Sequence, residues 1–218
     1  MISTVFFDLD GTFADTAPDL AAALNQLLKE HGQPNLSMDE IRPTVSLGGN
    51  AMIKLAFGID ESSVGFNSKR QRFLDIYSER MHNSTKLFQG MQDVINTLES
   101  DNIIWGIITN KPAWLTDPLM QKLDMEKRAA CIISGDTTNF RKPHPAPMHH
   151  ACELTHSKPE NTLYVGDARR DIEAGRAAGM HTLIALYGYI SSDEDPDEWL
   201  ADGMVSNPHE IITWLRNF

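Results

Sequence analysis

The sequence predicts an α/β protein whose parallel sheet is interrupted, after its first strand, by a helical segment. Short apolar stretches at residues 5–7, 103–108, 162–165 and 182–186 alternate with helical patterns, which is typical of parallel strands joined by right-handed crossovers. Roughly residues 16–85 carry helical patterns and no strand pattern. These observations predict a Rossmann-like doubly wound parallel sheet core with an inserted all-helical cap domain.

The chain has 218 residues, enough for a sizeable core and a modest second unit. We expect an α/β core that comprises residues 1–14 and 89–218 and a helical cap that comprises residues 15–88. Asp15 and residues 89–90 lie near the two crossings and are the candidate hinges.

The cap begins with two helix signals. Thr16 is a candidate cap for a first helix, Asp19 favours the positive end of that helix, and Gly32 is a plausible stop. Ser37 and Glu40 have the spacing of a capping box and predict the start of a second helix.

Two further helices complete the predicted cap. Gly48 and Gly49 open an apolar run over residues 51–57. A longer helix carries a stripe of large apolar side chains at helical spacing, namely Phe66, Phe73, Tyr77 and Met81. The simplest interpretation of these stripes is a helical core.

The rest of the chain follows the α/β pattern. The expected elements are a helix at 91–100, strands at 103–108, 130–134, 162–165 and 182–186, a helix at about 171–178, a weak strand at 204–205 and a last helix from about 208. The acidic stretch 191–198 is most simply a solvated loop.

The composition limits the partners. The formal net charge is −11 and the isoelectric point is about 5.1, so nucleic acid and anionic membranes would be repelled on average, and we expect neither as a partner. No stretch approaches the roughly 20 apolar residues that span a bilayer, and the first residues lack a signal-peptide pattern. Cys131 and Cys152 suit a reducing cytosol. We expect a cytoplasmic monomer or homodimer.

Two carboxylates mark the end of the first strand. Residues 5–7 run into Asp8, Leu9 and Asp10, and Gly11 allows a sharp turn there. Side chains two apart share one face of a strand, and ligands of open α/β sheets bind outside the carboxyl ends of the strands. Two such close carboxylates repel unless a cation or a shared proton relieves them. The alternative is a plain strand followed by an Asp-Gly turn.

Residues 8–12, Asp-Leu-Asp-Gly-Thr, resemble the first signature of the haloacid dehalogenase-like phosphohydrolases. The resemblance implies that Asp8 is the nucleophile and Asp10 the general acid/base. The chain departs from the usual pattern at Phe13 and Ala168, and neither change touches a proposed catalytic atom.

Three further parts of that signature follow in order. Thr109, followed by Asn110, stands at the end of the second core strand, and Lys142 stands in a Lys-Pro-x-Pro context. Asp167 ends a later strand and Asp171 opens the next helix. The resemblance implies that Thr109 and Lys142 hold and neutralise a phosphate. Each part alone has a plain structural alternative, but the four parts in order are specific.

The resemblance also implies Mg²⁺ as cofactor. Asp8 and Asp167 would supply carboxylates, and Asp10 would supply its backbone carbonyl, as suits a hard cation. We expect Asp171 to orient waters bound to the metal; the alternative is that it caps a helix beginning at residue 172.

Additional substrate-binding residues are expected from both parts of the chain, namely Gly11, Thr12, Asn110 and Lys111 from the core and Arg42, Gly48 and Gly49 from the cap. Gly48 and Gly49 would leave space and bare N–H groups. Arg42 and Lys54 would supply positive charge.

The resulting hypothesis is a Mg²⁺-dependent phosphatase that hydrolyses a small phosphate monoester through an aspartyl-phosphate. The chain resembles the phosphoglycolate phosphatase group, and stretches such as 46–52 and 104–112 are closer to the bacterial N-acetylmuramic acid 6-phosphate phosphatases. A phosphomutase shares the first chemical step and remains an alternative. A receiver-like signalling domain is disfavoured, because its phosphorylated Asp follows a later strand, whereas here the Asp-x-Asp-Gly-Thr group lies on the first strand and a large cap follows. A non-catalytic phosphate-binding module is disfavoured, because every expected catalytic side chain is present.

Overall fold

The structure, a computed structural model, describes residues 1–81 and 83–218. Its core is a six-stranded sheet in the order β5-β4-β1-β6-β7-β8. The strands are β1 (Thr4–Phe7), β4 (Ile104–Ile108), β5 (Ile132–Ile133), β6 (Thr162–Gly166), β7 (His181–Ala185) and β8 (Gly203–Val205). All neighbouring strands run parallel, which confirms the predicted doubly wound core.

Helices bury both faces of this sheet. The core helices are α5 (Met91–Ser100), α6 (Ala113–Lys122), α7 (Ala146–Thr155), α8 (Arg169–Ala177) and α9 (His209–Asn217), with short 3-10 turns at Pro159–Asn161 and Pro196–Trp199. Along β1, Phe6 packs with side chains of α7 and α8, whereas Val5 and Phe7 pack with those of α5 and α9. The alternation follows from the two-residue period of a strand.

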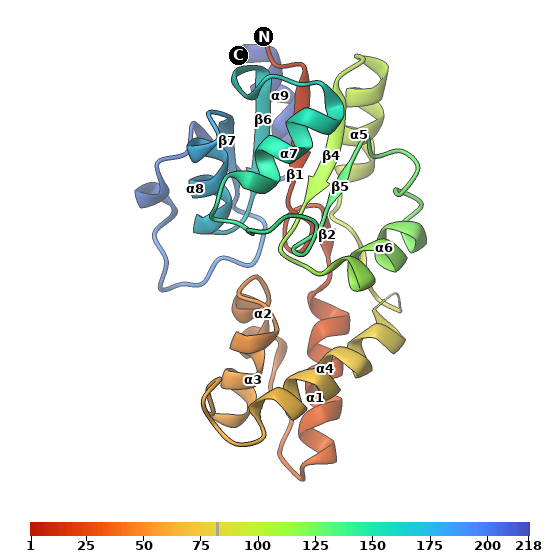
Figure 1. Ribbon diagram of the computed structural model, residues 1–218, viewed down its shortest axis with the longest axis vertical. Helices are drawn as coiled ribbons and strands as arrows, with labels where there is room; N and C mark the ends of the chain where they lie inside the picture. Colours follow the sequence, from red (N-terminus) through yellow and green to blue (C-terminus); the bar gives the residue numbers. More distant parts are fainter. Residues whose placement is uncertain (82) are drawn as a thin grey trace.

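The cap is an all-helical layer, as predicted. Its helices are α1 (Ala17–Glu30), α2 (Met38–Val45), α3 (Gly49–Phe57) and α4 (Phe66–Arg80). Figure 1 shows them together below the sheet, with both chain termini at the opposite end of the core. The cap helices pack mainly on one another, above all α1 on α4.

A short antiparallel ribbon lies where the chain leaves and re-enters the core. It pairs β2 (Ala14–Asp15) with β3 (Lys86–Leu87). The sequence did not predict these strands, because two residues carry no periodicity. Apart from His82, which lies outside the described residues, the segment 16–85 contains helices and loops, as expected.

Thr16 stands at the N-cap position of α1, as predicted, but its side chain makes no capping hydrogen bond. The Thr16 hydroxyl instead donates to Oδ1 of Asp10 at 2.6 Å. Asp19 is buried, and its carboxylate accepts from the backbone N–H groups of Ser84 and Thr85 and from the Thr85 hydroxyl. Asp19 therefore ties the first cap helix to the segment that returns to the core.

The predicted N-terminal caps of α2 and α8 have different outcomes. The capping box of Ser37 and Glu40 is confirmed. Asp171 is not the residue before its helix, since α8 already begins at Arg169. Its Oδ2 accepts from the backbone N–H of Ala168 at 3.0 Å, so Asp171 caps the helix from inside the first turn.

Smaller differences concern the edges of the sheet. The strand expected at 130–134 is only two residues long. The acidic stretch contains part of the 3-10 turn that ends at Trp199, whose side chain is buried.

Cys131 and Cys152 are both free and buried, as expected for small core residues. Among the described residues, no helix is both long enough and apolar enough to span a membrane.

Candidate active site

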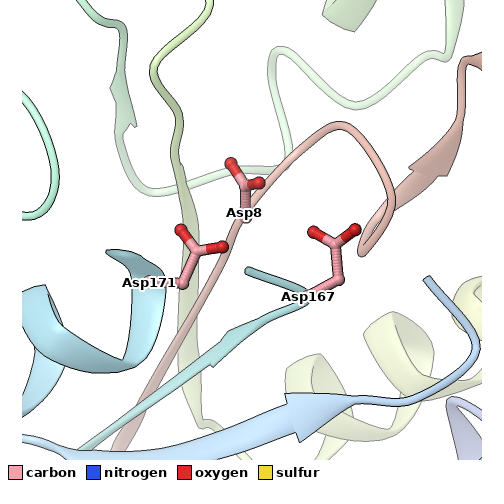
Figure 2. Close-up of side chains that lie close together, drawn as sticks. All are labelled: Asp8, Asp167 and Asp171. Carbon is pink, nitrogen blue, oxygen red and sulfur yellow. The ribbon is translucent and has the colours of Figure 1, made fainter. Parts of the chain in front are cut away.

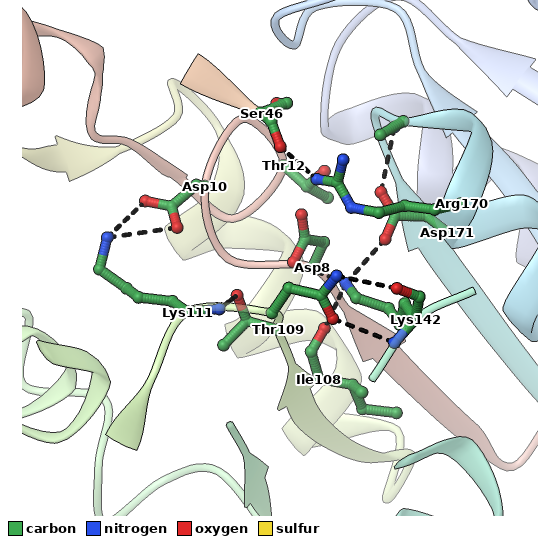
Figure 3. A network of polar contacts seen from close by, with 12 residues as sticks. Asp8, Asp10, Thr12, Ser46, Ile108, Thr109, Lys111, Lys142, Arg170 and Asp171 are labelled. Carbon is green, nitrogen blue, oxygen red and sulfur yellow. Dashed lines mark hydrogen bonds and ion pairs between the residues drawn. The ribbon is translucent and has the colours of Figure 1, made fainter. Parts of the chain in front are cut away.

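The chemistry-bearing residues meet at one edge of the sheet. Asp8 follows β1, Thr109 follows β4 and Asp167 follows β6, and these three strands are adjacent. Lys142 comes from the loop before α7 and Asp171 from the first turn of α8. Figure 3 shows most of this network around Asp8. The predicted convergence of strand ends is therefore what the fold provides.

Three carboxylates form the centre of this edge. Oxygen atoms of Asp8, Asp167 and Asp171 lie within 4.8 Å of one another, and all three residues are buried (Figure 2). Burial, together with the charges of Asp8 and Asp171, raises the pKa of Asp167 to about 7. Burial also raises the pKa of Asp8, although the Lys142 ammonium opposes that shift. The cluster therefore carries more negative charge than its surroundings stabilise.

Lys142 is the counter-charge inside the cluster. Its fully buried ammonium lies 2.8 Å from Oδ1 of Asp8 and 2.7 Å from Oδ1 of Asp171. It also donates to the carbonyl oxygen of Ile108 and to the hydroxyl of Tyr164. These contacts fix the ammonium against the proposed nucleophile.

Asn110 supports this lysine. Its side-chain amide donates to the carbonyl of Lys142 at 2.9 Å and accepts from the backbone N–H of Lys142 at 3.1 Å. Both ends of the amide are therefore used to hold the Lys142 loop. Because Asn110 also lines the cavity between core and cap, its predicted contact with phosphate stays a prediction beside this support of Lys142.

The cluster suits a hard divalent cation. Its ligand atoms are carboxylate oxygens, which Mg²⁺ prefers, and in the described part of the chain only Lys142 forms ion pairs with them. Asp171 already caps α8 and contacts Lys142. All three carboxylates could hold the cation, and the expected division, with Asp8 and Asp167 as direct ligands and Asp171 as a residue that supports them, stays a prediction.

Asp10 occupies a different environment from Asp8. Its carboxylate accepts from Nζ of Lys111 at 3.0 and 3.3 Å and from the Thr16 hydroxyl at 2.6 Å. Lys111 also lies over the ring of Tyr77, 4.6 Å from its centroid. Burial, the largest single effect, lowers the pKa of Lys111, but Asp10 and Tyr77 together outweigh burial and raise the pKa of Lys111 above its ordinary value. Asp10 and Lys111 therefore form a hydrogen-bonded pair beside Asp8.

Gly11 and Thr12 shape the carboxylate cluster. Gly11 has a φ of +89°, and a Cβ there would overlap the Asp167 carboxylate. Thr12 directs its hydroxyl to Oδ1 of Asp167 at 3.2 Å. Neither residue lines the cavity described below, so the structure associates both with Asp167 and not with a substrate pocket.

A cavity of about 1010 Å³ lies between the core and the cap. Core residues that line it include Asp8, Asp10, Thr109, Asn110, Lys111, Lys142 and Arg170. Cap residues that line it include Ser46, Gly48, Gly49, Phe66, Arg70, Phe73 and Tyr77. The cavity thus joins the carboxylate cluster to the inner surface of the cap.

Two predicted cap residues lie elsewhere. Neither Arg42 nor Lys54 lines the cavity. The guanidinium of Arg42 pairs with Asp15 at 3.2 Å and lies over the ring of Tyr189. The expectation that Arg42 binds substrate is therefore corrected: its charge joins the cap to the hinge segment.

Sequence reasoning missed three residues around Asp167. The Tyr189 backbone N–H donates to Oδ2 of Asp167 at 2.9 Å, and a Cβ at Gly188 would overlap the same side chain. The signal was available, because residues 187–189 follow the end of β7, another strand of the same sheet edge. Arg170 was also missed, although it directly precedes Asp171.

The cap touches the cluster directly. The Ser46 hydroxyl donates to Oδ2 of Asp167 at 2.7 Å. The guanidinium of Arg170 donates to the carbonyl oxygen of Ser46 (Figure 3). The loop between α2 and α3 is therefore held on the core from two sides.

Comparisons with known proteins agree with this geometry. The family of haloacid dehalogenase-like hydrolases matches residues 5–185. An N-acetylmuramic acid 6-phosphate phosphatase of Pseudomonas putida is 40% identical over 210 residues, which cover 96% of this chain and 94% of that protein. A phosphoglycolate phosphatase of Xanthomonas campestris pv. campestris is 39% identical over 207 residues, covering 95% and 93%.

Solved structures show the same fold. A crystal structure of a predicted phosphoglycolate phosphatase from Haemophilus somnus 129pt superposes with a TM-score of 0.87 at 24% identity and covers 98% of both chains. The fold, the converging strand-end residues and the family match agree. The chain belongs to the haloacid dehalogenase-like hydrolases.

Proposed function

We propose that this protein is a Mg²⁺-dependent phosphatase that hydrolyses a small phosphate monoester through an aspartyl-phosphate intermediate. One observation carries the proposal. Asp8 lines the cavity with its Oδ1 on Lys142, while Asp167 and Asp171 lie beside it. Oδ2 of Asp8 has no hydrogen-bond partner among residues 1–81 and 83–218, which leaves that atom free to attack phosphorus.

The first step forms the intermediate. An oxygen of Asp8 attacks phosphorus, the bond between phosphorus and the ester oxygen breaks, and the leaving oxygen takes a proton from Asp10. In the second step a water attacks the aspartyl-phosphate and gives its proton to Asp10, which releases inorganic phosphate and restores Asp8. Asp10 suits both tasks because its carboxylate lines the cavity beside Asp8.

The remaining core residues would stabilise charge. Lys142 and Thr109 line the cavity next to Asp8, where an ammonium and a hydroxyl would bind phosphoryl oxygens. Mg²⁺ held by Asp8, Asp167 and the Asp10 carbonyl would neutralise charge on the phosphoryl group. Ser46 and Arg170 would hold the cap closed so that bulk water is excluded.

The size of the cavity favours the larger of two candidate substrates. Ligand pockets usually measure about 300–1,000 Å³, and this one, at about 1010 Å³, exceeds what a two-carbon acid phosphate needs. Apolar cap side chains line it beside the bare backbone of Gly48 and Gly49. We therefore favour N-acetylmuramic acid 6-phosphate, the substrate in the name of one relative, over 2-phosphoglycolate, the substrate in the name of another.

We also infer that the protein acts in the cytoplasm. Its two cysteines, Cys131 and Cys152, are free and buried, which suits a reducing compartment. The expected oligomeric state, a monomer or a homodimer, stays a prediction.

The direct test is release of inorganic phosphate from a panel of phosphate esters in Mg²⁺ and in EDTA. Both candidate substrates belong in the panel, with Asp8→Asn as the matched inactive variant. We expect Mg²⁺-dependent turnover, abolished in Asp8→Asn, and a higher kcat/KM for N-acetylmuramic acid 6-phosphate. A preference for 2-phosphoglycolate of about tenfold, roughly 1.4 kcal/mol in transition-state binding, would reverse the substrate assignment. Full activity of Asp8→Asn would overturn the mechanism.

A further inference from the structure

An arginine interrupts the apolar face of α4. Phe66, Phe73 and Tyr77 are buried on this face, and Arg70 follows Phe66 by four residues and precedes Phe73 by three. These spacings place Arg70 on the same stripe. All four residues line the cavity. The stripe is therefore not only a helical core, because one of its positions presents a cation to the cavity.

Among the residues that the structure describes, none pairs with the charge of Arg70. Its Nε is buried without a hydrogen bond, and its guanidinium forms no ion pair within the residues that the structure describes. Arg72, two residues further on, pairs instead with Glu30 at 2.7 Å on the exposed surface. A buried donor without a partner costs free energy, so a ligand that supplies an anion to the half-buried Arg70 would remove that cost.

The other charged groups of the cavity show which part of a substrate would meet Arg70. On the core side, Lys142 contacts Asp8, Lys111 contacts Asp10 and Arg170 donates to the carbonyl oxygen of Ser46. The remaining core cation, Arg141, is exposed next to Lys142. Glu61 lines the cap side and accepts from the amide of Asn50 at 3.0 Å. Among the described cap residues that line the cavity, Arg70 is the only cationic side chain. A phosphate bound at Asp8 therefore leaves Arg70 for the part of the ester that is not transferred.

We propose that Arg70 binds a carboxylate on the leaving group and so selects phosphate esters of carboxylic acids. The proposal rests on the phosphatase function proposed above. A planar guanidinium matches a carboxylate with two parallel hydrogen bonds. A single cationic side chain on the cap suits a singly charged carboxylate better than a second phosphate. Arg70 thus takes the role that the sequence assigned to Arg42.

The test compares pairs of substrates in which one member carries a carboxylate on the leaving group and the other does not. N-acetylmuramic acid 6-phosphate is paired with N-acetylglucosamine 6-phosphate, which lacks the lactyl acid, and 2-phosphoglycolate is paired with ethyl phosphate. Arg70→Met keeps an unbranched side chain on an apolar stripe, Arg70→Lys keeps only the charge, and Arg72→Ala is the control on the same helix.

Arg70→Met should lower kcat/KM for the acid substrate about 30-fold or more, mainly through KM, as loss of one partner of a buried charge pair does. The neutral substrate should change by no more than about threefold, a size typical of surface substitutions. For Arg70→Lys, kcat/KM for the acid substrate should lie between the values of the wild type and of Arg70→Met. Arg72→Ala should keep the wild-type ratio of kcat/KM between the acid and the neutral substrate. Without substrate, Arg70→Met should match or exceed the wild type in Tm, because it removes an unpartnered charge.

The possible outcomes distinguish failure of the carboxylate role of Arg70 from failure of the proposed phosphatase function. If the wild type releases phosphate from none of the esters, the phosphatase function fails. If the wild type is active but Arg70→Met lowers kcat/KM equally for both members of a pair, or for neither, the carboxylate role of Arg70 is overturned while the phosphatase function stands. If Arg70→Met fails to fold, Arg70→Lys must still shift the ratio of acid to neutral substrate, and an unchanged ratio would contradict the proposal.

Discussion

The hydroxyl of Ser46, in the cap, lies 2.7 Å from Oδ2 of Asp167, in the core, and donates a hydrogen bond to it. The same carboxylate belongs to the acidic cluster that suits a metal ion. Arg170 reinforces the contact by donating to the carbonyl oxygen of Ser46. Docking of the cap and occupation of the cluster therefore involve one shared side chain.

Loss of the Ser46 hydroxyl should weaken cap docking. A hydrogen bond to a charged group contributes about 1.5 kcal/mol or more, so we expect Ser46→Ala to lower kcat/KM roughly tenfold. Amide hydrogen exchange in the loop between α2 and α3 should become faster. Ser62→Ala, at an exposed cap loop, is the control. Unchanged exchange and activity in Ser46→Ala would show that the hydroxyl does not hold the cap.

Asp10→Asn should separate the two chemical steps. Because Asp10 would protonate the leaving oxygen, turnover of an alkyl phosphate should fall by about 10²–10⁴-fold. p-Nitrophenolate needs no such proton, so rapid mixing with p-nitrophenyl phosphate should give a burst close to one equivalent, followed by slow hydrolysis. Full kcat on an alkyl phosphate would assign the acid/base role to another residue.

The core of the site was predictable because topology brings it together. Adjacent parallel strands end at one edge, so Asp8, Thr109 and Asp167 had to lie close to one another once their strands were recognised. The same rule, applied to the strand ending at Ala185, would have found Tyr189.

The cap was less predictable, because its side chains are placed by packing between helices. Arg42 and Arg70 are both cationic cap residues, and only the fold shows that Arg42 pairs with Asp15 while Arg70 faces the cavity. The helical spacing between Phe66 and Phe73 was visible in the sequence, but it does not reveal whether a stripe faces a core or a cavity.

Lys142→Met should destabilise the protein through the charges that it leaves behind. Lys142 is fully buried against Asp8 and Asp171, and removing one partner of a buried pair costs about 3 kcal/mol or more. For a chain of this size that corresponds to a fall in Tm of roughly 6–12 °C. Lys158→Met, at an exposed position, is the control. Mg²⁺ should restore part of the loss, and a fall no larger than the control's would contradict the assigned role.

The raised pKa of Asp167 predicts how the affinity for Mg²⁺ depends on pH. In the folded protein the pKa is about 7, against an ordinary value of 3.8. Between pH 3.8 and about pH 7, Asp167 therefore holds a proton in the folded state that it has released in the unfolded state. The contribution of Asp167 to the free energy of unfolding therefore falls as the pH rises through this window.

Mg²⁺ must displace that proton, so its binding should strengthen with pH. We expect the Kd for Mg²⁺, measured by calorimetry, to fall about tenfold per pH unit between about pH 5 and pH 6.5 and to level off above about pH 7.5. The rise in Tm caused by Mg²⁺ should grow over the same range. Asp167→Asn should lose most of the Mg²⁺ effect, whereas Asp39→Asn, at an exposed position of the cap, should keep it. A Kd that stays constant from about pH 5 to pH 7 would mean that Asp167 is not the proton-linked ligand.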